Sequence, residues 1–241
     1  APDCRMLFYA DIMNTEPLQR LLNVPVALKK PARIDGYMNS LQSELSIQAS
    51  VPQLSISDQD YADISLSVST PADALNAIIK AKKVLSNGNK AEYALNAMAA
   101  NNKLSAALNF DNHSKLHIKG NMNANAQFSR NEEGKVKAVV NIMPSQMMID
   151  DTNWDIMSST LTYSPKHIEI ENFAIEHDDQ HIHINGLATE DNSDSLTVDL
   201  KDVDVAYILN LVNFHAVEFD GLASGKAFVS GIFGTPHAKA N

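Results

Sequence analysis

Residues 44–51 read ELSIQASV, in which polar and apolar side chains alternate without interruption. Successive side chains of a β-strand point to opposite faces of the sheet, so this stretch predicts a strand with one apolar and one polar face. Further runs with the same period lie at residues 63–68, 104–110, 116–118, 122–128, 136–142, 168–170, 173–175, 182–184 and 196–200. Alternation over so much of the chain predicts an all-β fold.

Polar segments with turn chemistry separate these runs. They occur at residues 111–114 (DNHS), 131–134 (NEEG), 164–166 (SPK) and 189–194. Asn, Asp, Ser, Gly and Pro in such clusters favour tight turns and hairpin loops. The intervals between runs are too short for helical crossovers, so we expect a mainly antiparallel sheet with meander connections.

Three segments depart from the strand pattern and are predicted to be short helices: residues 17–23, 74–85 and 205–212. For the middle one, Thr70 is the expected N-cap, lysines occupy the C-terminal turns, and Asn87-Gly88 ends the helix. The first and third helices each precede a strand that contains Asp-Gly, at Asp35-Gly36 and at Asp220-Gly221. This similarity indicates a structure built from repeated units.

Two further glycines occupy positions inside predicted strands. Gly120 follows Ile118-Lys119, and Gly186 follows Ile184-Asn185. A glycine in a strand marks a bulge, a bend or a close approach of another backbone segment.

Composition limits the classes of function. The chain has 241 residues and a formal net charge of −10, which disfavours a nucleic-acid-binding protein because phosphate neutralisation needs a basic surface. Cys4 is the single cysteine, so one chain can form neither a disulfide framework nor a cysteine-based zinc site. The first residues do not have the pattern of a signal peptide, and no apolar run is long enough for a membrane-spanning helix. We expect the chain to be a fragment of a longer protein.

Motifs of catalysis and cofactor binding are absent. The sequence has no GxSxG nucleophile elbow, no GxxxxGK[ST] phosphate loop and no GxGxxG. The adjacent carboxylates Asp150-Asp151 and Asp178-Asp179 are better interpreted as solvated turn residues than as an acid/base pair. The sequence therefore predicts no enzymatic activity, no cofactor and no catalytic residue.

Two further features have a structural and a functional interpretation. His181 and His183 share one face of a predicted strand and could form half of a metal site, although the polar side of a strand is the favoured interpretation. Trp154, the single tryptophan, is expected to be a packing residue rather than a platform for a ligand.

Several stretches resemble the TamB group of the AsmA-like family, in the form seen in Bacteroidetes. They are the DDTNW of residues 150–154 before the strand IEIENF (168–173), then QHIHINGLA (180–188), then SLTVDLKDVDV (195–205), which leads to FDGLASG (219–225) and VSG (229–231). The similarity covers about residues 115–241. We accordingly divide the chain into an N-terminal β-repeat region with short helices, 1–114, and a TamB-like β-repeat region, 115–241, in one continuous structure.

The resemblance implies an elongated, curved β-sheet groove (β-taco-like) with an apolar lining. It implies a periplasmic segment of an inner-membrane-anchored protein of the Gram-negative envelope. The implied functions are phospholipid transport between inner and outer membranes and assistance to outer-membrane protein assembly. The implied partners are phospholipid acyl chains and a TamA-like barrel assembly protein, which would bind parts of the parent protein outside this chain.

Apolar positions of the predicted strands are the candidates for the lining of this groove. They are Leu104, Leu108, Phe110, Leu116, Ile118, Ile168, Ile170, Ile182 and Ile184. A second interpretation stays open at this point: a non-enzymatic structural or protein-interaction β-domain of a cell-envelope protein. It would have a closed core and an exposed apolar patch.

Overall fold

The computed structural model describes residues 4–15, 26–56, 59–85, 88–205, 207 and 221–240. Within these ranges it has eighteen β-strands, one short 3-10 turn (Pro71–Asp73), and helical backbone at Val205 and Tyr207. The neighbouring strands whose residue pairing is described run antiparallel to each other. The prediction of an all-β, mainly antiparallel fold is confirmed. Nowhere in the described ranges is a helix both long and apolar enough to cross a membrane.

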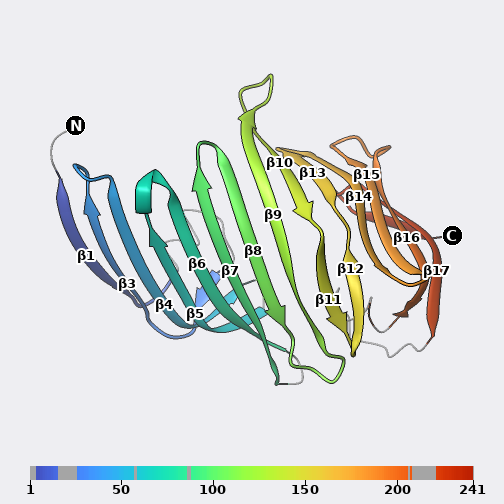
Figure 1. Cartoon of the computed structure of the whole chain (residues 1–241), viewed down its shortest axis with the longest axis horizontal. Helices are drawn as coiled ribbons and strands as arrows, with labels where there is room; N and C mark the ends of the chain where they lie inside the picture. The colour runs from blue at the N-terminus through green and yellow to red at the C-terminus, as the bar shows by residue number, and fades with distance from the viewer. Residues whose placement is uncertain are drawn as a thin grey trace. The chain divides into compact units, whose positions relative to one another are not determined.

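The chain divides into two compact units, residues 1–119 and 120–241. The strands of the first unit are β1 (Arg5–Ile12), β2 (Val26–Leu28), β3 (Ala32–Asn39), β4 (Glu44–Ile56), β5 (Gln59–Ser69), β6 (Leu75–Val84), β7 (Lys90–Ala100) and β8 (Lys103–Asp111). β1 pairs with β3, and β3 to β8 then pair in chain order, as Figure 1 shows (blue to green). β2 pairs with the far end of β4.

The register of the first unit aligns apolar residues across the whole sheet. One row of cross-strand partners consists of Ala10, Ile34, Ala49, Leu66, Ile79, Leu95 and Leu108. The adjacent row, one residue further along the strands, consists of Arg33, Ser50, Ser65, Lys80, Ala94 and Asn109. Because alternate residues point to opposite faces, one face of this sheet is apolar and the other is mostly polar.

The helix predicted over residues 74–85 is wrong, because this segment forms strand β6. Thr70 precedes only the 3-10 turn and makes no side-chain capping hydrogen bond. Its hydroxyl accepts a hydrogen bond from the Leu45 backbone N–H (2.7 Å) and donates one to the Ser43 carbonyl (2.9 Å). β6 is paired on both sides, with β5 and with β7. Two ladders of backbone hydrogen bonds outweigh the helix propensity of its alanines and lysines.

The other two predicted helices fall mainly on residues that the structure does not describe. Residues 17–23 lie outside the described ranges. Of residues 205–212, Val205 and Tyr207 have helical backbone, and the others lie outside the described ranges.

The second unit contains ten strands, of which β9 begins with the last residues of the first unit. They are β9 (Ile118–Arg130), β10 (Val136–Met143), β11 (Ser145–Ile149), β12 (Thr152–Ile156), β13 (Ser159–Ser164), β14 (His167–His177), β15 (Gln180–Ala188), β16 (Ser195–Asp204), β17 (Leu222–Ser230) and β18 (His237–Ala240). β9 pairs with both β10 and β11, and β14 pairs with both β13 and β12. β14 to β18 then follow in chain order.

Two bulges adjust the alternation within the second unit. The register of β14 shifts between Ile170 and Phe173, where Asn172 has a φ of 57°. The register of β16 shifts between Leu200 and Val203, where Asp202 has a φ of 51°. Each bulge adds one residue, so the apolar residues on both sides of it point to the same face.

The strand glycines lie where another backbone segment approaches closely, as predicted. A Cβ on Gly186, which has a φ of 131°, would lie 2.4 Å from the Ser195 carbonyl oxygen on β16. A Cβ on Gly120 would lie 2.8 Å from the Cα of Met147 on β11. At both positions any larger side chain would have to displace the neighbouring strand.

The second unit has a buried core that contains large side chains. Trp154, Ile149 and Val203 are fully buried, and Met147 and Ile156 are nearly so. In the described part of the first unit, the buried apolar side chains are Ala32, Ala62, Ala91 and Ile118. The first unit therefore leaves its large apolar side chains partly open to solvent.

Candidate functional site

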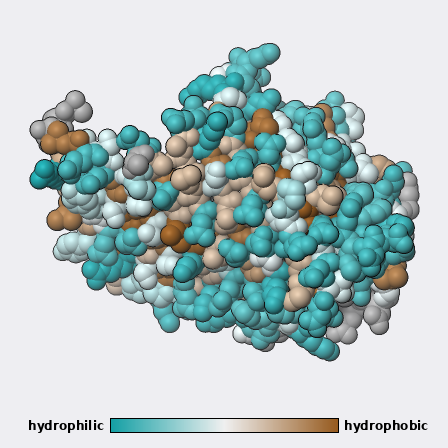
Figure 2. All heavy atoms as spheres, viewed as in Figure 1, coloured by the Kyte–Doolittle hydropathy of each residue, from teal (hydrophilic) through white to brown (hydrophobic). Residues whose placement is uncertain are grey.

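The apolar face of the first unit extends over several neighbouring strands. We define it by the large apolar side chains of β4 to β8 that share the aligned register: Leu45, Ile47, Val51, Ile64, Leu66, Val68, Leu75, Ile79, Leu95, Leu104, Leu108 and Phe110. Each of these side chains is half-buried or exposed, and none is fully buried. Leu75 is 40% exposed and Ile79 is 37% exposed. Figure 2 shows hydrophobic residues at the surface among hydrophilic ones.

Three of the predicted lining residues lie on this face. Leu104, Leu108 and Phe110 are on β8, opposite Ala99, Leu95 and Tyr93 of β7 respectively. Burial raises the pKa of the Tyr93 phenol, and the nearby Tyr61 raises it further. This edge of the apolar face thus combines aliphatic and aromatic side chains.

Leu116 and Ile118 do not belong to the aligned rows. Leu116 lies in the connection between β8 and β9 and is half-buried, and its carbonyl accepts a hydrogen bond from the Asn112 side chain (2.8 Å). Ile118 begins β9 and is buried, with 7% of its surface exposed.

The remaining four predicted lining residues share one face of the second unit. Ile168 and Ile170 on β14 pair with Ala188 and Gly186 on β15, on the same side as Ile182 and Ile184. The bulge at Asn172 maintains this alignment across the length of β14. Ile182 is buried, and the other three are half-buried.

Trp154 is a packing residue of the second unit, as predicted. Its ring is fully buried, with its centroid 5.6 Å from that of His177 and 6.2 Å from that of Tyr207. The indole Nε1 has no hydrogen-bond partner within the described structure. Trp154 therefore offers no accessible surface to a ligand.

His181 and His183 lie side by side on β15, with stacked rings whose centroids are 4.0 Å apart. The Nε2 of His183 lies 2.7 Å from a Glu176 carboxylate oxygen, and the Nε2 of His181 lies 4.0 Å from an Asp199 carboxylate oxygen. Their ligand atoms do not form a close group of three in the described part of the chain. The adjacent carboxylates of the sequence, Asp150-Asp151 and Asp178-Asp179, are exposed turn residues, as predicted.

Sequence reasoning missed one cluster, formed by Asp111, His113 and His117. It treated Asp111 and His113 only as turn residues, whereas the structure brings ligand atoms of all three within 4.8 Å of one another. The signal that could have found it is the spacing Asp-x-His-x-x-x-His directly after a strand. Partial burial raises the pKa of Asp111, but hydrogen bonds from the His113 backbone and the His117 imidazole outweigh this effect and hold the pKa below its usual value.

A pocket of about 430 Å³ lies next to this cluster, on the mostly polar side of β5 to β8. Its lining includes Lys80, Lys82, Glu92, Asn109 and Asp111. The Lys82 ammonium lies 3.2 Å from Glu92 and 3.7 Å from Asp63. The hydrogen bond between Lys82 and Glu92 lowers the pKa of the carboxyl and raises the pKa of the amine. The lining also includes Ala81, Tyr93, Ala94 and Phe110, so charged groups and apolar side chains lie side by side in this pocket.

Comparison with known proteins returned no match among protein-family models, curated proteins or solved structures. The function proposed below therefore rests on the physical features of the chain and on the resemblance stated above.

Proposed function

We propose that this chain is a periplasmic segment of an envelope-biogenesis protein and offers an apolar sheet surface to phospholipid acyl chains. This surface would carry phospholipid between inner and outer membranes. The same parent protein would also assist outer-membrane protein assembly. The observation that carries the proposal is the apolar face of the first unit, in which aligned large side chains stay partly exposed.

The dimensions of the apolar face suit an acyl chain. The row from Ala10 to Leu108 crosses seven strands, β1 and β3 to β8. Six spacings of ~4.8 Å make this row about 29 Å long. One acyl chain spans one leaflet, about half of the ~30 Å hydrocarbon core of a bilayer, so the row is longer than a single chain. A lipid chain lying along the row would meet apolar side chains over its full length.

The energetics favour a surface of this kind for lipid transfer. Moving two acyl chains of ~16 carbons into water costs ~0.8 kcal/mol per CH₂, or about 25 kcal/mol in total. An apolar surface removes most of this barrier by replacing the bilayer with another apolar environment. Tight binding is not required, and no catalytic group takes part.

The composition of the face is consistent with a fluid guest. Its members are mostly Leu, Ile and Val, and aromatic residues make up 6% of the whole chain. Fluid acyl chains need apolar area rather than a shaped pocket with fixed polar groups. The envelope location, the inner-membrane anchor of the parent protein and the TamA-like partner come into this proposal from the resemblance alone.

A second candidate function is a structural or protein-interaction β-domain. One observation favours it: Leu7 and Tyr9, on β1, are 82% and 79% exposed. They alternate with Phe8 and Ala10 of the apolar rows, so they point to the opposite side of the sheet. In the described pairings β1 has one neighbour, β3, and an edge strand with exposed apolar side chains suits a protein partner.

Ile79 and Ile78 provide a matched test of the lipid proposal. They are consecutive residues of β6 with similar exposure, 37% and 44%, but they lie on opposite faces. We expect Ile79→Asp to reduce phospholipid adducts in native mass spectrometry about tenfold or more. A carboxylate placed against acyl chains costs more than the 1.4 kcal/mol that corresponds to a factor of ten.

Ile78→Asp is the control, and it should leave the adducts unchanged. Equal adduct loss in both variants, or no adducts on the unchanged protein, would contradict the proposal. Loss of partner binding through substitutions at Leu7 and Tyr9, with no lipid adducts at all, would favour the protein-interaction domain.

A further inference from the structure

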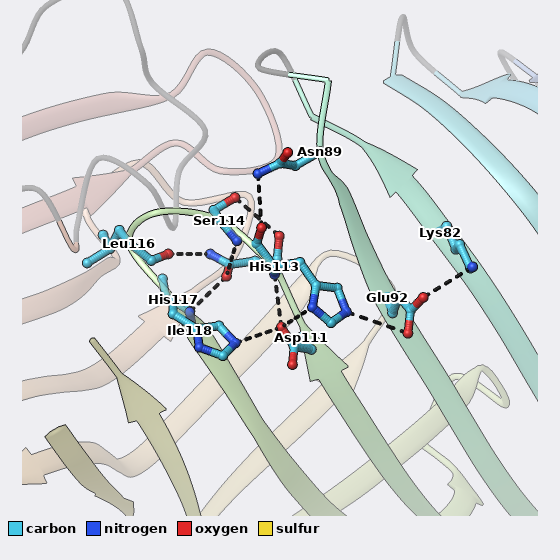
Figure 3. Close-up of polar contacts among 10 residues, drawn as sticks. Lys82, Asn89, Glu92, Asp111, His113, Ser114, Leu116, His117 and Ile118 are labelled. Carbon is cyan, nitrogen blue, oxygen red and sulfur yellow. Dashed lines mark hydrogen bonds and ion pairs between the residues drawn. The ribbon is translucent and has the colours of Figure 1, made fainter. Parts of the chain in front are cut away.

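The cluster at the end of β8 brings two imidazoles to one carboxylate oxygen. The Oδ1 of Asp111 lies 2.9 Å from the Nε2 of His117 and 3.2 Å from the Nδ1 of His113 (Figure 3). The two imidazole rings are 6.4 Å apart between centroids and nearly parallel, with an interplanar angle of 24°. The imidazoles therefore direct one nitrogen each toward the same point.

The connection between β8 and β9 is held in this arrangement by its own hydrogen bonds. The Oδ1 of Asn112 accepts hydrogen bonds from the backbone N–H of Ser114 (3.2 Å) and of Ile118 (2.8 Å), and its Nδ2 donates to the Leu116 carbonyl. The Asn89 side chain donates to the His113 carbonyl (2.9 Å). Figure 3 shows these contacts around the two rings. The loop is therefore organised before any ligand arrives.

An outer carboxylate supports one of the two imidazoles. The Nε2 of His113 lies 3.6 Å from Glu92 on β7, and Glu92 in turn lies 3.2 Å from Lys82 on β6. A histidine that binds a metal through one nitrogen usually directs its other N–H toward a carboxylate, which sets the tautomer and strengthens the ligand. Glu92 has the position required for that role when His113 binds through Nδ1.

We propose that Asp111, His113 and His117 bind one divalent first-row transition-metal ion. The ligands would be the carboxylate of Asp111, the Nδ1 of His113 and the Nε2 of His117. Two imidazoles and one carboxylate suit Zn²⁺ and its neighbours in the series, whereas Mg²⁺ and Ca²⁺ prefer oxygen ligands. With metal–nitrogen distances of ~2.0–2.1 Å, tetrahedral ligand atoms are ~3.3 Å apart. The Oδ1 of Asp111 lies 2.9 Å from the Nε2 of His117 and 3.2 Å from the Nδ1 of His113, and both distances are close to that value.

Bound metal would have two consequences. It would tie β8 to the start of β9 across the connection 112–117, which the structure otherwise holds by hydrogen bonds. Three protein ligands also leave at least one coordination position for water or another ligand. Asp111 lines the pocket of about 430 Å³, so such a ligand could come from that pocket.

Zn²⁺ titration of the full chain after chelator treatment tests this inference. We expect binding of one equivalent, measured by calorimetry, and a rise in melting temperature with Zn²⁺ concentration. His117→Ala and Asp111→Asn should each weaken binding by more than ~100-fold, since each removes a direct ligand. Glu92→Gln should weaken it ~10-fold or more through the outer contact, as removal of such partners typically costs 10–100-fold in affinity.

The matched control is the double variant His181→Ala, His183→Ala, which removes the other histidine pair and should leave binding unchanged. Visible absorption of Co²⁺ bound in place of Zn²⁺ gives a second measurement, because its bands depend on the ligands. Far-UV circular dichroism identifies a variant that has failed to fold, and Glu92→Gln then tests the site without removing a ligand. Absence of one-equivalent binding, or equal binding by all variants, would overturn the inference. Neither result depends on lipid binding.

Discussion

The residue type of Trp154 predicts its burial but not the hydrogen bonding of its indole N–H. A lone tryptophan in a β-rich chain predicts a packing residue, and the structure buries its ring completely against His177 and Tyr207. Its indole N–H, however, has no partner in the described structure, which residue type alone does not reveal. The position of a buried polar atom depends on the neighbouring elements, and these are set by tertiary packing.

We expect Trp154→Ala to lower the free energy of unfolding of the second unit by ~3–5 kcal/mol, as for other large-to-small core substitutions. Trp154→Phe should cost clearly less, because it keeps an aromatic ring and removes the unpaired N–H. Urea denaturation followed by circular dichroism measures both. A larger loss for Phe than for Ala would contradict the described packing.

The cluster of Asp111, His113 and His117 shows why some sites escape sequence reasoning. His113 has a φ of 44°, and Asn112 binds the backbone at Ser114 and Ile118. These local features turn two imidazoles toward one carboxylate. Strand periodicity predicts which residues share a face, but it does not predict the course of a turn. The residues were therefore visible in the sequence while their proximity was not.

At the scale of elements, the alternation of apolar and polar residues predicted most strands. An exception is β6, which was predicted to be a helix. Its residues include Ala, Lys and Leu, which favour a helix, and the Thr70-Pro71 that precedes it resembles a helix start. Period-two order was nevertheless present, in Leu75, Ala77, Ile79 and Ala81. Pairing with both β5 and β7 decides the outcome, and that pairing is a long-range property. The bulges at Asn172 and Asp202 were likewise not predicted, because each depends on its neighbouring strand.

Ala77→Val distinguishes a strand from a helix by the sign of its effect. In β6, Ala77 is half-buried between Val68 and Ala97, so a β-branched side chain should pack well and raise the free energy of unfolding by up to about 1 kcal/mol. In a helix the same change is destabilising. Chemical denaturation measures the difference, and Ala77→Gly should be destabilising as the control. Destabilisation by valine would contradict the strand environment described for β6.

At the scale of the whole molecule, the two units differ in how far they bury their large apolar side chains. The second unit buries Trp154, Ile149 and Val203 in its core. The described part of the first unit buries mainly alanines, and it leaves side chains such as Leu75 and Ile79 substantially exposed. The sequence predicted the apolar rows of both units from the same alternation. Alternation identifies which residues share a face, but the cover over that face depends on how distant segments pack.

Cross-linking with a phospholipid that carries a photoreactive group on one acyl chain tests the central proposal most directly. Peptide mapping by mass spectrometry then locates the attached lipid on the full chain. The proposed function predicts attachment on the apolar face of the first unit, at residues such as Ile79, Leu95 and Leu108. The opposite face, with the exposed Ile78 and Met98, should carry little or none. Equal attachment on both faces, or attachment confined to the opposite face, would contradict it.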